Sequence, residues 1–113
     1  MKKIRIAICD DDSIGRGLLQ ESLEYLLQEN NLQAEISSYS SGQELLQTQD
    51  RYDILFLDIK MPKINGIQTA EKYRKWYEDT IIIFLTLYEK YVFEGYKVNA
   101  FRYLKKPMEQ EKL

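Results

Sequence analysis

The chain has 113 residues, of which 44% are hydrophobic and 30% charged, and this size and composition fit one globular domain. Sixteen basic and eighteen acidic residues give a formal net charge of -2, which argues against nucleic acid or an anionic membrane surface as the direct partner. The chain has no histidine, its single cysteine (Cys9) cannot form an internal disulfide, and no apolar run approaches the roughly 20 residues of a membrane span. We therefore expect a cytoplasmic protein that does not use histidine-based catalysis.

The first half of the chain is predicted to form two strand–helix pairs. Ile4–Cys9 is typical of a strand, and Ser13–Asn30 has the apolar spacing of a helix with one buried face, capped by Asp12 or Ser13. Ala34–Ser40 alternates as a second strand, and Ser41–Glu44 fits a capping box at the start of a short helix. The apolar residues of the first helix are Ile14, Leu18, Leu19, Leu23, Leu26 and Leu27.

The second half continues the alternation of strands and helices. Ile54–Leu57 and Ile81–Leu85 are continuous apolar runs, which suit parallel strands covered on both faces. Between them, Gly66–Tyr77 has helical spacing. Tyr88–Lys97 is a weaker helix, and Ala100–Leu104 is a last short strand. This order predicts an α/β fold with an open, doubly wound, five-stranded parallel sheet and helices on both faces.

Reactive side chains follow several of these strands. Asp10, Asp11 and Asp12 follow the first, Asp58 ends the third, Thr86 the fourth, and Lys106 comes after the fifth. The carboxyl ends of parallel strands line one crevice, so we expect these groups to converge there. Converging carboxylates repel one another, and Mg²⁺, which prefers oxygen ligands, would relieve that repulsion.

The chemistry that fits this set is the formation and hydrolysis of an aspartyl phosphate. A carboxylate can attack a phosphoryl group while a metal ion and a lysine balance the charge on the transferring oxygens. Thr86 would then bind an oxygen of the new phosphoryl group.

Four motifs in order along the chain resemble the receiver domain of bacterial two-component response regulators. They are Ile8-Cys9-Asp10-Asp11-Asp12, Leu57-Asp58-Ile59-Lys60-Met61-Pro62 with Gly66, Phe84-Leu85-Thr86, and Tyr103-Leu104-Lys105-Lys106-Pro107. Together they span almost the whole chain. The resemblance implies a flavodoxin-like (CheY-like) fold and a signalling phosphoacceptor domain that is not an enzyme beyond self-phosphorylation and autodephosphorylation.

The resemblance also implies the role of each matching residue. Asp58 is the expected phosphoacceptor, with Asp11, Asp58 and the Lys60 carbonyl as ligands of Mg²⁺ (or Mn²⁺) and Asp10 acting through a water. The residues that bind phosphate or switch conformation are Thr86, Tyr103 and Lys106. Those at positions that tune the lifetime of the aspartyl phosphate are Lys60, Leu87 and Tyr88.

The stretch from Tyr88 to Leu104 further resembles receivers joined to a LytTR-type DNA-binding domain, as in LytR- and AgrA-like regulators. This implies a sensor histidine kinase as phosphodonor, homodimerisation on activation, and contact with DNA only through a separate C-terminal domain that these 113 residues do not include. Six residues follow Pro107, too few for the last receiver helix, so we expect residues 1–113 to be a receiver with that helix truncated.

Three other functions remain open at this point. Asp10 and Asp12, with Thr86 and Lys106, also resemble the haloacid-dehalogenase-type phosphatases, in which Asp10 would be the nucleophile. This alternative leaves Asp58 and the Met61-Pro62 pair without a role. A stand-alone receiver, or a pseudo-receiver that acts by protein contacts alone, would keep the same fold.

Overall fold

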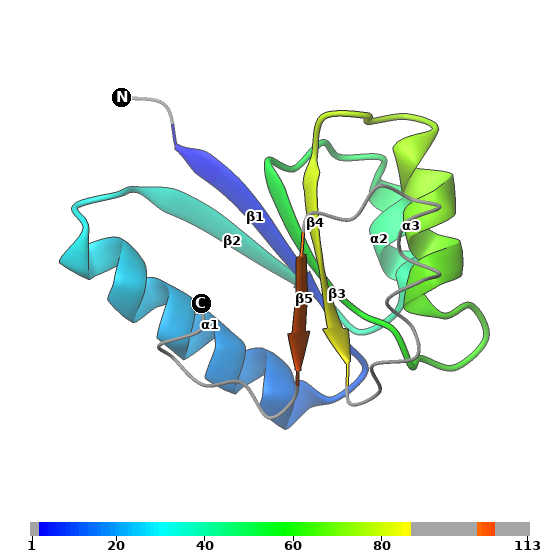
Figure 1. Ribbon diagram of the computed structural model, residues 1–113, viewed down its shortest axis with the longest axis horizontal. Helices are drawn as coiled ribbons and strands as arrows, with labels where there is room; N and C mark the ends of the chain where they lie inside the picture. Colours follow the sequence, from blue (N-terminus) through cyan, green and yellow to red (C-terminus); the bar gives the residue numbers. More distant parts are fainter. Residues whose placement is uncertain (1–2, 87–101, 106–113) are drawn as a thin grey trace.

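The computed structural model describes residues 3–86 and 102–105, and it describes the side chains of all of these except Thr86 and residues 102–105. Five strands form one parallel sheet in the order β2-β1-β3-β4-β5, as Figure 1 shows. The strands are β1 (Ile4–Cys9), β2 (Ala34–Tyr39), β3 (Ile54–Asp58), β4 (Ile81–Thr86) and β5 (Arg102–Lys105). The helices are α1 (Ser13–Glu29), α2 (Gly42–Thr48) and α3 (Gly66–Arg74). The doubly wound parallel sheet predicted from the sequence is confirmed.

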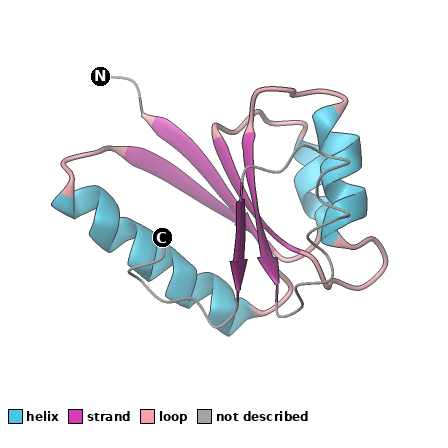
Figure 2. Ribbon diagram, in the orientation of Figure 1, coloured by secondary structure: helices cyan, strands magenta, loops and turns pink. Residues whose placement is uncertain are grey.

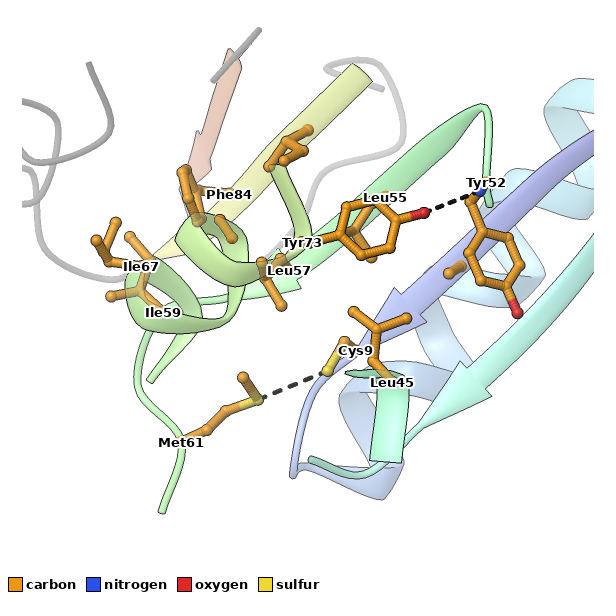
Figure 3. Packing of buried hydrophobic residues seen from close by; sticks show 13 residues of the cluster. Cys9, Leu45, Tyr52, Leu55, Leu57, Ile59, Met61, Ile67, Tyr73 and Phe84 are labelled. Carbon is orange, nitrogen blue, oxygen red and sulfur yellow. Dashed lines mark hydrogen bonds between the residues drawn. The ribbon is translucent and has the colours of Figure 1, made fainter. Parts of the chain in front are cut away.

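Both faces of the sheet are covered, which explains the continuous apolar runs. Helix α1 lies on one face, and α2 and α3 lie together on the other (Figures 1 and 2). Successive residues of a strand point to opposite faces, so Ile6 and Ile8 of β1 pack with Leu19 of α1, whereas Ala7 and Cys9 pack on the side of α2 and α3. The core on the second side is drawn in Figure 3.

Helix α1 buries a narrower stripe than the sequence predicts. Leu19 and Leu23 are buried, but Ile14 and Leu18 are 73% and 60% exposed, so the prediction of one buried face containing all six apolar residues was wrong. A helix turns by about 100° per residue, which places Ile14 and Leu18 on the side opposite Leu19 and Leu23. The sheet contacts only one of these two stripes.

The capping residues of α1 and α2 differ in how well they were predicted. The side chain of Asp12 accepts a hydrogen bond from the Ile14 N–H and so caps α1 as expected. Ser41 caps α2 by accepting from the Glu44 N–H, but the Glu44 carboxylate bonds chiefly to Ser40 and only weakly to the N–H of Ser41. The predicted capping box is therefore only half formed.

Helix α3 is bounded by contacts that the apolar pattern did not reveal. It begins at a reciprocal capping box between Asn65 and Gln68. It ends at Arg74, three residues before the predicted Tyr77. There the Arg74 guanidinium donates to the carbonyls of Tyr77, Glu78 and Thr80, and these bonds stabilise a turn in place of another helical turn.

Two predictions for the end of the chain have different outcomes. The last strand is present and is described over Arg102–Lys105, whereas its predicted first residue, Ala100, lies outside the described residues. The weaker helix expected over Tyr88–Lys97 lies outside the described residues. Among the helices that are described, none is long and apolar enough to cross a membrane.

Candidate functional site

The carboxyl end of β1 places Asp10 at the edge of the sheet. Its N–H donates to the Tyr39 carbonyl at 3.1 Å, so hydrogen bonding to β2 continues one residue past the strand. The Asp10 side chain is 2% exposed, and its Oδ1 accepts from the Asp12 N–H at 3.0 Å. Asp11, in contrast, is exposed. The loop thus contributes one buried and one solvent-facing carboxylate.

The carboxyl end of β3 holds Asp58, which is 5% exposed. The next residue, Ile59, donates from its N–H to the Leu85 carbonyl and accepts at its carbonyl from the Gly66 N–H. Gly66 lies so close to this segment that a Cβ there would overlap the Asp58 carbonyl oxygen. The absence of a side chain at Gly66 is therefore what lets α3 start directly against the strand end.

The structure brings three of the predicted carboxylates together. Strands β1 and β3 are neighbours, and carboxylate oxygens of Asp10, Asp11 and Asp58 lie within 4.8 Å of one another. Charges this close repel each other when all three groups are ionised. Carboxylate oxygens are the donors that Mg²⁺ prefers, so the donor set and its spacing fit a small divalent cation.

The structure describes only some of the other predicted site residues. Thr86 is the last residue of β4, directly after Leu85, whose register partner is Asp58, so its backbone lies at the same edge of the sheet. Tyr103 of β5 pairs with Phe84, farther from that edge. Lys60 is exposed on the loop after β3. Leu87, Tyr88 and Lys106 lie outside the described residues.

Cys9 is next to this cluster but is not a nucleophile. Its Sγ donates to the Ser41 carbonyl at 3.2 Å. It also contacts the Met61 sulfur at 3.9 Å, as Figure 3 shows. Burial, reinforced by the nearby carboxylates of Asp10 and Asp58, raises the pKa of the thiol to about 12. The thiol is therefore protonated at neutral pH.

Sequence reasoning missed one residue that contacts this site. The Arg16 guanidinium, from the first turn of α1, donates to the Asp10 carbonyl at 2.6 Å. Only three residues separate β1 from α1, so the first turn of the helix lies close to the end of the strand. An arginine six residues after Asp10 could therefore have been predicted to contact the site.

Comparison with known proteins decides the family. The model of the response regulator receiver domain matches residues 6–113. The chain belongs to this family. Receiver domains are signalling modules rather than conventional enzymes, and they interact with histidine kinases and with response regulator partners.

Two curated relatives and one solved structure place the receiver more closely. The chain is 41% identical to the sensory transduction protein LytT of Oceanobacillus iheyensis and 32% identical to the transcriptional regulatory protein LytR of Staphylococcus aureus. In both cases 97% of the chain is aligned, and it spans about 45% and 44% of those proteins. The response regulator TrrA of Thermotoga maritima, crystallised in complex with Mg²⁺-BeF, is 34% identical with a TM-score of 0.80, over 96% of the chain and 91% of TrrA.

These comparisons support the receiver prediction over its alternatives. The chain is a receiver domain homologous to LytT and LytR response regulators, and a phosphoacceptor role in two-component signalling fits it. The phosphatase alternative is not favoured. Receiver domains bind Mg²⁺ at an acidic pocket, and the described residues include such a cluster of aspartates.

Proposed function

We propose that Asp58 is the phosphoacceptor of this receiver, and that residues 1–113 act as the input domain of a longer LytTR-type regulator. The observation that carries the proposal is the approach of the Asp10, Asp11 and Asp58 carboxylates at the carboxyl ends of β1 and β3. Asp58 is the residue of this set that ends a strand inside the sheet, between β1 and β4. Its backbone therefore belongs to a strand that is paired with a neighbour on each side.

The transfer step that we propose uses one oxygen of the Asp58 carboxylate. That oxygen forms a bond to phosphorus while the P–N bond of a kinase phosphohistidine breaks, and the imidazole leaves with the electron pair of that bond. The backbone position of Thr86 at the same edge of the sheet supports a role in binding the transferred group. By family resemblance Lys106 would contact the same oxygens, Tyr103 would follow the switch, and Lys60, Leu87 and Tyr88 would tune its lifetime.

The divalent cation is proposed to be Mg²⁺, with Mn²⁺ as a substitute. Asp10, Asp11, Asp58 and the Lys60 carbonyl would hold it, and when bound it would neutralise charge on the phosphoryl oxygens. Asp10 is a buried carboxylate of this set, whereas Asp11 is exposed to solvent. A cation would thus enter from the side of Asp11.

The whole regulator is proposed to transmit the modification to DNA. Phosphorylation adds roughly 1.5 to 2 negative charges and three acceptor oxygens to the crowded end of the sheet, which favours a rearranged surface. We infer that this surface mediates homodimerisation in the cytoplasm and controls an attached DNA-binding domain. The similarity to the transcriptional regulatory protein LytR of Staphylococcus aureus supports this part of the proposal.

Intact mass after incubation with acetyl phosphate and Mg²⁺ tests the assignment of Asp58. Wild type is expected to gain one phosphoryl group, and Asp58→Asn is expected to gain none. An adduct that survives in Asp58→Asn but disappears in Asp10→Asn would transfer the role to Asp10, as in a phosphatase. A wild type that gains nothing would contradict the phosphoacceptor function itself.

A further inference from the structure

Arg16 reaches from α1 back to the strand that precedes it. Its side chain is partly buried, and Nη1 donates to the main-chain carbonyl of Asp10 at 2.6 Å. A hydrogen bond from a charged donor is stronger than a neutral one, and the planar guanidinium holds its direction well. The contact therefore joins the first turn of α1 to the peptide group between Asp10 and Asp11.

This carbonyl lies one residue past the paired part of β1. The register of β1 with β2 ends at the pair of Cys9 and Tyr39, and the N–H of Asp10 still bonds to the Tyr39 carbonyl. The Arg16 guanidinium adds a contact from α1 at this point. Asp10 is thus held at its N–H by β2, at its carbonyl by Arg16, and at Oδ1 by the Asp12 N–H.

The peptide that Arg16 holds sets the direction of two of the clustered carboxylates. Rotation of the Asp10–Asp11 peptide would turn Asp11 away from Asp58, because Asp11 is exposed and packing does not hold it. The Arg16 N–H also donates to the Asp12 carbonyl at 2.9 Å, so main chain and side chain of the same residue close the loop. One arginine thereby orients the whole segment between β1 and α1.

We propose that Arg16 is a positioning residue for the divalent-cation site, which orients Asp10 and Asp11 toward Asp58 through its bond to the Asp10 carbonyl. This inference rests on the proposed function, because it concerns the same cation. Groups that orient metal ligands from behind typically change metal affinity by about 10- to 100-fold when they are removed. Such groups usually bond to the side chain of a metal ligand, whereas Arg16 bonds to the main chain. We therefore expect a loss of Mg²⁺ affinity at the lower end of this range.

The sign of the effect separates positioning from simple electrostatics. Removing a positive charge beside three carboxylates should by itself strengthen the binding of a cation. Removing a group that orients the ligands should weaken it. Arg16→Met does both, so weaker binding identifies positioning as the dominant role.

Calorimetric titration of the full chain with Mg²⁺ at neutral pH is the test, with Arg74→Met as the matched control. Arg74 also donates to main-chain carbonyls, and its replacement removes the same charge, but it does so at the end of α3 beside the strand starts. We expect Arg16→Met to raise the Mg²⁺ Kd about tenfold and Arg74→Met to leave it unchanged. Arg16→Lys keeps a charged donor, so its Kd should lie between those of wild type and Arg16→Met. Exchange of the Asp12 amide hydrogen, which bonds to Asp10 Oδ1, should accelerate in Arg16→Met alone.

Each outcome decides the question. An Arg16→Met protein that binds Mg²⁺ as tightly as wild type, or more tightly, overturns the positioning role and leaves the proposed function intact. If Arg16→Met does not fold, Arg16→Lys decides alone, and a Kd equal to that of wild type together with an unchanged Asp12 exchange rate overturns the inference. A wild-type chain without Mg²⁺ binding would instead overturn the cation site on which the inference rests.

Discussion

Gly66 shows at the scale of one residue how closely α3 approaches the strand that carries Asp58. A Cβ at Gly66 would overlap the Asp58 carbonyl oxygen and come within 2.9 Å of the Asp58 carbonyl carbon and of the Ile59 Cα. All of these are backbone atoms at the end of a central strand and of the residue that follows it, and Asp58 cannot move without disturbing its pairing with β4. The position therefore tolerates no side chain.

We expect Gly66→Ala to lower the free energy of unfolding by about 1–3 kcal/mol or more, as overpacking does in rigid sites. Gly17→Ala is the matched control, because Gly17 lies inside α1 with no atom within 4 Å of the added methyl group. That change should raise stability by about 0.5–1 kcal/mol, since alanine is the better helix former. Urea unfolding of both variants measures this, and equal effects would contradict the close approach at Gly66.

The buried thiol of Cys9 predicts a pH dependence of stability. Burial raises its pKa from 9.0 to about 12 in the folded state, so between these values the unfolded chain loses a proton that the folded chain keeps. The stabilisation is complete below pH 9 and is lost as the pH rises toward 12. From pH 8 to pH 10.5 the wild type should lose about 2 kcal/mol more stability than Cys9→Ala.

Urea unfolding of both proteins at these two pH values measures the difference. The tyrosines also titrate in this range, and the comparison cancels them because both proteins contain all nine. Stability curves that stay parallel from pH 8 to pH 10.5 would show that the thiol ionises equally in the folded and unfolded states.

At the scale of elements, α1 has two apolar stripes but only one packs on the sheet. Leu19 and Leu23 pack against Ile6, Ile8 and Phe56, whereas Ile14 and Leu18 face solvent in the described part of the chain. Apolar spacing identifies a helix, but it does not say which of two stripes meets the core. Only the position of α1 on the sheet decides that.

Leu18 and Leu19 are adjacent leucines that test this division directly. Leu19→Ala should lower the free energy of unfolding by about 2–4 kcal/mol, because it removes buried methyl groups and leaves a cavity. Leu18→Ala should change it by no more than about 0.5 kcal/mol, as at other exposed positions. Chemical denaturation of the two variants checks the prediction, and similar losses would mean that both stripes are covered.

In the whole molecule, the clustered carboxylates and a second polar cluster lie at opposite edges of the sheet. The carboxylates gather at the carboxyl ends of the strands, while a hydrogen-bonded cluster closes the opposite edge, where β3 and β4 begin. There the Tyr73 hydroxyl donates to the Asp50 carbonyl at 3.1 Å. The same hydroxyl accepts from the Tyr52 N–H at 2.9 Å, as Figure 3 shows. Arg51 bridges Asp53 and Asp79 beside it.

We expect Tyr73→Phe to destabilise the fold without affecting the site at the other edge. The change leaves the buried Tyr52 N–H without its partner, which typically costs about 1–3 kcal/mol. Phosphorylation by acetyl phosphate should proceed as in wild type. Tyr25→Phe on the exposed surface of α1 is the control and should be neutral in both assays. A Tyr73→Phe protein of normal stability, or one with altered phosphorylation, would contradict this separation of the two edges.

The sequence by itself determined the class of fold and most of the candidate site. The length and period of the apolar runs identify the described strands and helices. Strands of a parallel sheet are covered on both faces, so they are continuously apolar, whereas the helices that cover them are apolar on one side. The positions of Asp10, Asp11 and Asp58 after strands predict their convergence, since the carboxyl ends of parallel strands share one edge. The roles assigned to these residues, and to Thr86, Tyr103 and Lys106, stay predictions.

Only the tertiary structure decided how these parts meet. The choice of Leu19 over Leu18 as a core residue, the turn of Glu44 toward Ser40, and the early end of α3 at Arg74 all depend on neighbours distant in sequence or on loop geometry. The bond from Arg16 to the Asp10 carbonyl is of the same kind. It joins a side chain of α1 to the backbone at the end of β1, and a local sequence pattern does not show which backbone groups a side chain will meet in the tertiary fold.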